Sequence, residues 1–430
     1  MSPAASPAPA HTGQPTPPVG LILTGGGARA AYQVGVLKAI AEIARTCRVA
    51  SNSPFQVIAG TSAGAINASA LACSADDFQA SVQTLVEVWE NFSVEQVYRA
   101  DSLGVIRTGA PWLTMMSLGW LIARWKRVKP RSLLDNSPLQ GLLQRMIPFE
   151  RLPDLMAQGH LQALAVTASS YSSGEHVTFY DSANGIQPWA RHRRQAVRTR
   201  LSVPHLLASA AIPFLFPSIP LAIEGRREWF GDGSMRQVAP ISPAVHLGAQ
   251  RILIIGAGRM HEPPDREIPT NGYPSVAQIA GHALSNIFLD ALAADVERLQ
   301  RINTTLALLP PEARALTPLR PIDALVIAPS QRLDDIAARH IEALPITIRA
   351  LLGAIGVGGE GHATRGAALS SYLLFEAAYT RDLIELGMAD THARRDAVLR
   401  FFGWSPTPAE AADTAENDTT RRVRLTSCLP

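Results

Sequence analysis

The chain has 430 residues, of which 47% are hydrophobic and 17% charged, and its formal net charge at pH 7 is +3. This length can bury a substantial core in one large domain or two ordinary ones, and so small a net charge argues against an extended nucleic-acid interface. Its three cysteines, Cys47, Cys73 and Cys428, are widely spaced and odd in number. We therefore expect neither a disulfide framework nor a zinc site, and a reducing, cytoplasmic compartment.

The two ends of the chain differ in composition from its body. Residues 1–18 are rich in Pro, Ala and Ser, and they lack the basic start and apolar core of a secretory signal. Residues 405–430 have no apolar periodicity either. We expect a disordered N-terminal arm over 1–18, a folded domain with added C-terminal helices over 19–404, and a disordered tail over 405–430.

Strand-like and helix-like patterns alternate along the body. Short apolar runs over 19–23, 55–60, 161–169, 175–181, 251–257 and 323–329 predict buried strands, and longer patterns over 76–92, 274–301 and 364–386 predict helices. This alternation indicates an α/β fold, in which a mostly parallel central sheet carries helices on both faces.

A glycine loop, Gly25-Gly26-Gly27, follows the first strand pattern and precedes a helical one. Such a loop can hold a nucleotide phosphate or stabilise an oxyanion. A P-loop would end in Gly-Lys-Ser/Thr, which is missing here, and a dinucleotide fingerprint needs an acidic residue after a second strand. Glu42 has about the required spacing, but it falls inside the first helix pattern. The second use, in which backbone N–H groups face a developing negative charge, is therefore favoured.

The sequence Gly60-Thr61-Ser62-Ala63-Gly64 has the G-x-S-x-G form of a nucleophile elbow. It lies between a strand pattern and a small-residue helix pattern, where the serine would occupy a tight, strained turn that only small neighbours tolerate. The helix N-terminus behind the serine favours negative charge. Ser62 is thus a candidate nucleophile.

Residues 108–123 form an uncharged apolar segment, and the basic sequence "RWKRVKPR" follows it over 124–131. The segment is shorter than the roughly 20 residues of a membrane-spanning helix. It fits two interpretations, a pair of buried helices or a membrane-facing lip. In the lip, Trp112, Trp120 and Trp125 would contact the interface and the basic residues would lie near anionic head groups.

Two residues are candidates for the base that Ser62 needs. His205 begins a small-residue helix pattern, although a single histidine of this kind usually has a structural role. Asp232 lies between two glycines after an apolar run, so that a loop would present its carboxylate, although an Asp-Gly pair is usually only a turn. The residues taken singly leave both candidates open.

Taken together, "GGGARAA", "GTSAG" and "DGS", with "ASAAIPFLFPSI" between the last two, resemble the patatin-like phospholipases over about residues 19–243. The resemblance implies a three-layer sandwich and a Ser–Asp dyad, with Ser62 as nucleophile and Asp232 as its base. It also implies that Gly25, Gly26 and Gly27 supply the oxyanion hole and that Arg29 anchors their loop. Ala30 and Ser234 depart from the family pattern, which commonly has Gly and Gly or Ala at these positions; the replacements are small and affect loop shape more than the dyad.

The resemblance predicts a serine acyl hydrolase that cleaves fatty-acyl esters of phospholipids or related lipids. We expect peripheral membrane contact, no nucleic-acid partner, no cofactor and no metal, because no His/Cys/carboxylate cluster has ligand spacing. Two alternatives use the same fold: an acyltransferase in which an alcohol or lysolipid replaces water, and a membrane-associated adaptor that has lost turnover. The intact Ser62, Asp232 and glycine loop argue against the adaptor.

Overall fold

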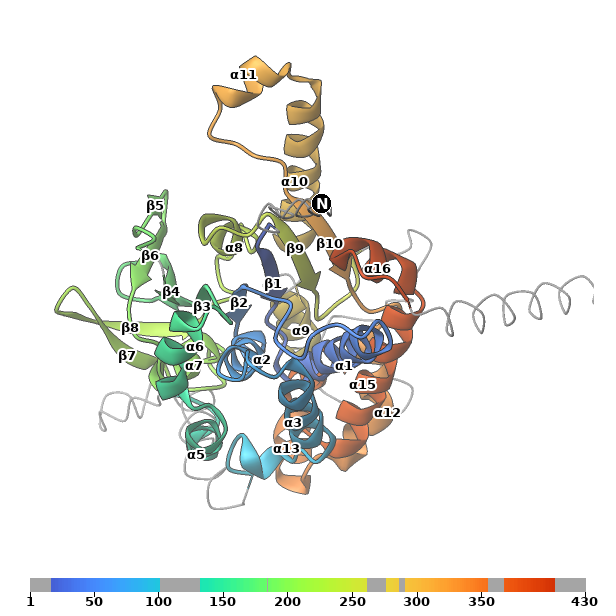
Figure 1. Cartoon of the computed structure of the whole chain (residues 1–430). Coiled ribbons are helices and arrows are strands. Elements are labelled where there is room, and N and C mark those ends of the chain that lie inside the picture. Colours follow the sequence, from blue (N-terminus) through green and yellow to red (C-terminus); the bar gives the residue numbers. More distant parts are fainter. Residues whose placement is uncertain are drawn as a thin grey trace, which may run out of the picture.

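The computed structural model describes residues 17–100, 132–183, 185–260, 276–285, 291–354 and 367–406. Within these ranges ten strands form one sheet (Figure 1). The strands are β1 Val19–Leu23, β2 Val57–Thr61, β3 Ala163–Ser170, β4 His176–Ser182, β5 Ala190–Arg191, β6 Arg194–Arg198, β7 Ile219–Ile223, β8 Arg226–Asp232, β9 Arg251–Ile255 and β10 Asp323–Ile327.

The sheet has a parallel half and a mixed half. Its order is β10-β9-β1-β2-β3-β4-β6-β5, and the first five strands all run parallel. Beyond β3 the pairing changes: β4 and β8 both run antiparallel to β3, and β7 pairs with β8. The expected α/β fold with helices on both faces is confirmed. The antiparallel strands β4 and β8 pair with opposite edges of β3, where Ala168 and Ser169 each have a partner in both strands.

The helices are α1 Ala31–Thr46, α2 Ala63–Ala72, α3 Phe78–Glu90, α5 Ser137–Met146, α6 Leu152–Ala157, α7 Val203–Ser209, α8 Ser242–His246, α9 Val276–Ser285, α10 Ala291–Leu308, α11 Pro311–Ala315, α12 Leu333–His340, α13 Ile346–Ala354, α14 Ala367–Leu373, α15 Ala377–His392 and α16 Arg395–Phe402. Short 3-10 turns cover η1 Gly27–Ala30, η2 Val94–Gln96, η3 Phe149–Arg151 and η5 Ile341–Ala343. The pattern over 364–386 proves to be two helices, since α14 ends at Leu373 and α15 begins at Ala377.

Successive side chains of each strand point to opposite faces of the sheet, and each face is covered by its own apolar layer. In β1, Leu21 and Leu23 join the larger core, which α1, α2, α3 and α15 cover, whereas Ile22 joins the smaller core beneath α8 and α10. Burial of both faces explains why β1 has no polar side chain and β2 has only Thr61 at its end, as expected of parallel strands. The site described below lies at the carboxyl ends of these strands, where ligands bind in open α/β sheets.

Helix α15 lies directly against α1 (Figure 1). A Cβ on Gly35 of α1 would lie 2.0 Å from the carbonyl oxygen of Ile384, and one on Gly387 of α15 would lie 2.3 Å from that of Tyr32. The two backbones therefore touch at positions where no side chain fits. Residues of α15, in the last quarter of the sequence, thus belong to the same hydrophobic core as α1.

None of the described helices is both long and apolar enough to cross a membrane. The predicted lip over 108–131, with Trp112, Trp120 and Trp125, lies outside the described residues, as do residues 1–16 of the arm and 407–430 of the tail.

Candidate active site

The serine elbow is a strained turn between β2 and α2. Ser62 has φ 55° and ψ −131°, a conformation that L-residues rarely adopt. A Cβ on Gly60 would lie 2.5 Å from the Cα of Ala65, and one on Gly64 would lie 2.4 Å from the carbonyl oxygen of Leu23. The glycines of the motif are therefore steric requirements of the turn.

Ser62 and Asp232 meet although 170 residues separate them. The Ser62 hydroxyl donates a hydrogen bond of 2.6 Å to Oδ2 of Asp232, and the backbone N–H of Ser234 donates one of 2.8 Å to Oδ1. Asp232 is the last residue of β8, and its pairing with Ala168 of β3 brings it beside the elbow. Both predicted dyad members thus lie in hydrogen-bonding contact.

Burial changes the chemistry of the Asp232 carboxyl. Its side chain has no exposed surface, and desolvation raises its pKa to about 6, against the opposing effect of the hydrogen bonds from Ser62 and Ser234. A carboxylate with this pKa is a stronger base than an exposed aspartate, and it is still mostly ionised at neutral pH.

Ser209, the last residue of α7, ties the two sides of the site together. Its hydroxyl accepts a hydrogen bond of 2.8 Å from the backbone N–H of Ser62, and its carbonyl accepts one of 3.1 Å from Gly233. Asp232 itself donates its N–H to Ala211 at 2.9 Å. Ser209 belongs to the small-residue stretch "ASAAIPFLFPSI", and within that stretch its sequence position carries no separate signal.

Two histidines lie near the site, and neither contacts Ser62. The buried Nε2 of His176 lies 3.0 Å from the Gly233 carbonyl, and desolvation lowers its pKa to about 4, so that a neutral ring with a proton on Nε2 would donate to this turn. His205, the alternative base, contacts the Ser202 hydroxyl through Nδ1 and the ring of Phe179. The structure brings Asp232, and not His205, to the serine.

The glycine loop lies between β1 and α1, beside the elbow. Gly26 packs so closely on Ala257 that a Cβ would lie 2.6 Å from the Cβ of that residue, and Gly27 has φ +55°. Gly25, Gly26 and Gly27 are all buried, and no described residue accepts a hydrogen bond from their backbone N–H groups. Buried donors of this kind suit an anion that arrives with the substrate.

Arg29 follows the glycines, and the contacts of its side chain are with the C-terminal helices. Its guanidinium lies among residues of α12 and α14, where it donates to Ser371 and pairs with Asp334. These partners had no signal in the sequence.

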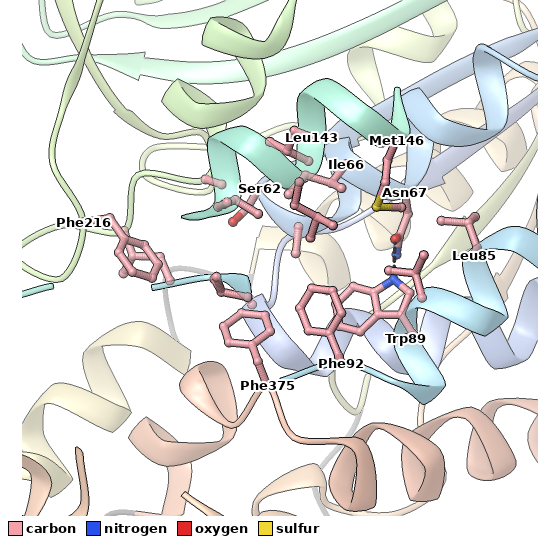
Figure 2. Close-up of a pocket in the computed structure, with 18 residues that line it drawn as sticks. Ser62, Ile66, Asn67, Leu85, Trp89, Phe92, Leu143, Met146, Phe216 and Phe375 are labelled. Carbon is pink, nitrogen blue, oxygen red and sulfur yellow. Dashed lines mark hydrogen bonds between the residues drawn. The ribbon is translucent and has the colours of Figure 1, made fainter. Parts of the chain in front are cut away.

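An apolar pocket opens next to Ser62 (Figure 2). Ile66 lines it from the elbow helix, Leu143 and Met146 from α5, and Trp89 from α3, with Phe92 just beyond that helix. Phe375, in the turn between α14 and α15, completes the wall. Ser62 is only 1% exposed, and it is itself one of the residues that line this pocket.

A chain of buried amides connects the pocket wall to the glycine loop. The indole of Trp89 donates to the Asn67 side chain at 2.9 Å, as the dashed line in Figure 2 marks. The amide of Asn67 donates to Gln33 at 3.2 Å, and Gln33 donates to the carbonyl of Thr24 at 2.7 Å. Asn67 and Gln33 have no exposed surface, so these bonds satisfy groups that would otherwise be costly to bury.

Among the described residues, no group of three or more His, Cys, Asp or Glu side chains is arranged to hold a metal ion. The Ser62–Asp232 pair, the glycine loop and the apolar pocket adjoin one another, since Ser62 and Gly27 both line that pocket. Together they can activate a hydroxyl, receive a negative oxygen and hold an apolar chain.

The model of the patatin-like phospholipase family matches residues 21–245, a little over half of the chain. A comparison with curated proteins gave no match.

Among solved structures, VipD from Legionella pneumophila is 14% identical, with 86% of this chain and 67% of that one covered and a TM-score of 0.31. Human GIVD cytosolic phospholipase A2 is 11% identical, with 90% and 60% covered and a TM-score of 0.41. The type III effector protein ExoU is 16% identical, with 83% and 78% covered and a TM-score of 0.27. The chain thus spans about two thirds or less of the first two proteins.

Proposed function

The chain belongs to the patatin-like phospholipase family, a family of lipid acyl hydrolases, and on this premise we propose that it cleaves fatty-acyl esters with Ser62 and Asp232. The observation that carries the proposal is the 2.6 Å hydrogen bond from the Ser62 hydroxyl to a fully buried carboxylate. A nucleophile and its base within this distance form the working unit of covalent acyl transfer.

In the proposed first step, Asp232 Oδ2 takes the proton of Ser62 as Oγ attacks the ester carbonyl carbon. The carbonyl oxygen becomes an oxyanion, which the N–H groups of Gly25, Gly26 and Gly27 stabilise. The intermediate collapses to an acyl-serine, and the leaving alcohol takes the proton from Asp232.

In the second step water attacks the acyl-serine, and Asp232 again serves as base. The tetrahedral intermediate breaks at the bond to Ser62 Oγ, which recovers its proton, and a fatty acid leaves. The apolar pocket supports this substrate class because it adjoins Ser62 and offers almost no polar surface to a ligand.

We further propose that the enzyme meets its substrate as a peripheral membrane protein, through the segment over 108–131. The proposal rests on the tryptophans and basic residues of that sequence alone. Binding to anionic vesicles that does not weaken with added salt, or that persists unchanged in a folded W112S/W120S variant, would contradict it.

The decisive experiment compares the wild-type chain with Ser62→Ala. We expect wild-type protein to react with a fluorophosphonate probe and to hydrolyse phospholipid vesicles, and the variant to do neither, with a loss of about 10⁴ or more in kcat. A folded Ser62→Ala variant with near-normal hydrolysis would end the serine mechanism.

The same assay separates the two alternative functions. Products formed with an added lysolipid acceptor distinguish an acyltransferase from a hydrolase. A wild-type chain that the probe does not label would be an inert scaffold.

A further inference from the structure

The glycine loop is attached to helices far along the chain through one arginine. The Arg29 side chain is 3% exposed, and its Nε donates a hydrogen bond of 2.8 Å to the Ser371 hydroxyl of α14. Its Nη2 forms an ion pair with Asp334 of α12. The guanidinium also lies 4.0 Å from the ring centroid of Tyr372. A buried arginine is thus held by an anion, a hydroxyl and an aromatic face, each of which it recognises well.

The backbone of the loop rests on the same helix. A Cβ on Gly27 would lie 2.3 Å from the carbonyl oxygen of Tyr372 and 3.2 Å from its Cα. The loop therefore has no room to shift toward α14. We call Arg29, Asp334, Ser371 and Tyr372 the loop clamp.

The clamp residues other than Arg29 lie outside the part of the chain that matches the family model, which ends at residue 245. Phe375, which lines the pocket beside Ser62, lies outside it as well. The C-terminal part of the chain thus contributes both to the pocket wall, through Phe375, and to the support of the glycine loop.

We propose that Asp334 and Ser371 are positioning residues, which act through Arg29 to aim the N–H groups of the glycine loop at the oxyanion. The inference rests on the proposed function and deepens it: the C-terminal helices become part of the catalytic machinery. The position of these N–H groups matters because a displacement of a catalytic group by about 1 Å lowers the rate on the order of 10²-fold.

Loss of the Asp334 charge would leave the Arg29 guanidinium buried without its anion. Such a charge draws in water or moves toward another acceptor, and Arg29 belongs to the 3-10 turn that begins at Gly27. The loop would then lose its fixed shape. The pocket residues that hold the acyl chain are separate from the clamp, so ground-state binding would change little.

The test compares Asp334→Asn with a control, Asp382→Asn. Asp382 of α15 also joins α12 to its neighbour, through His340 at 2.8 Å and Arg339 at 3.6 Å, but it contacts no residue of the loop. We expect Asp334→Asn to lower kcat by about 10- to 100-fold with little change in KM, and the control to keep wild-type kinetics.

A second measurement reports on the oxyanion hole itself. Thiono esters carry a C=S group, which accepts hydrogen bonds poorly, so a well-aimed hole makes the oxo ester the much better substrate. We expect the ratio of kcat/KM for oxo and thiono esters to fall in Asp334→Asn and to stay at the wild-type value in Asp382→Asn. A purely structural role of Asp334 would lower both rates together and leave the ratio unchanged, which would overturn the proposal.

Amide hydrogen exchange of residues 24–30 tests the clamp without turnover. Faster exchange there in Asp334→Asn, but not in the control, is the expected result; equal exchange in both would overturn the clamp. If the wild-type chain hydrolysed no ester, the proposed function would fail while the exchange still decided whether the clamp holds the loop. Should Asp334→Asn not fold, Ser371→Ala, which removes only a hydroxyl, carries the same three measurements.

Discussion

The two halves of this molecule contribute to the site in different ways. Residues 21–245 supply every reacting group of the proposed mechanism, and each of them lies in a short motif with a steric reason for its neighbours. The residues after 245 supply no reacting group, yet they contact the glycine loop, the pocket and α1. Reacting residues can therefore be recognised from short sequence motifs, whereas the residues that hold a loop in shape can lie anywhere in the chain.

The largest expected effect tests whether Asp232, in the first half of the chain, is the base that activates Ser62. Asp232→Asn keeps the shape of the side chain but removes the proton acceptor, so kcat should fall by about 10⁴. His205→Gln should keep nearly all activity, because the ring contacts Ser202 and Phe179 instead of Ser62. Short-chain ester hydrolysis, with folding checked by circular dichroism, decides the matter. A folded, inactive His205 variant beside an active Asp232 variant would mean that the base is assigned to the wrong residue.

The pH dependence gives the next effect. Because burial raises the pKa of Asp232 to about 6, the base is ionised above that pH and protonated below it. We expect kcat/KM to be level above about pH 7 and to fall roughly tenfold for each pH unit below 6. A profile that stays level down to pH 4.5 would contradict the buried carboxylate as base.

The raised pKa of Asp232 affects stability in the opposite direction from activity: activity should rise with pH, whereas the contribution of Asp232 to stability should fall. The folded state prefers the protonated carboxyl, so the contribution of Asp232 to stability is greatest at low pH and is lost as pH rises through about 6. Asp232→Asn should therefore unfold at a higher temperature than wild type at pH 8, by a margin that shrinks toward pH 4.

A smaller effect tests whether the second half shapes the pocket. Phe375→Leu should lower kcat/KM for long-chain esters relative to short-chain ones by up to about tenfold, since it removes apolar contact from the pocket wall. Phe401→Leu is the matched control: Phe401 has similar burial in the same half, but it lies outside the pocket. Equal chain-length preference in both variants would show that Phe375 packs only as core.

The smallest effect concerns the contact between the halves. Gly35→Ala would press a methyl group against the Ile384 carbonyl, and we expect the free energy of unfolding to drop by about 1–3 kcal/mol. Gly141→Ala in α5 meets only the far end of Arg145 at 3.5 Å, so it should raise that free energy by about 0.5–1 kcal/mol. Urea unfolding measures both, and a Gly35 variant as stable as wild type would mean that α1 and α15 separate easily.

The sequence predicts the features that depend on local patterns, and it does not predict the contacts that only the folded chain makes. The strands over 19–23 and 251–257, the elbow at Ser62 and the turn at Asp232 depend on apolar runs and small residues, which are visible locally. The sequence does not predict the strands β7 and β8, because exposed residues interrupt the apolar pattern in both. Asp334 and Ser371 had no signal at all, because only the folded chain brings them to Arg29.

The large separation of the clamp residues in the sequence also implies a delay during protein synthesis. Asp334 follows Arg29 by 305 residues, which corresponds to about 15–60 s of synthesis at about 5–20 residues per second. Throughout that interval a ribosome carries a chain whose glycine loop has no helix to rest on, even once Ser62 and Asp232 have emerged. If the clamp acts as proposed, the growing polypeptide would therefore be a poor esterase until α12 and α14 have been synthesised and have docked.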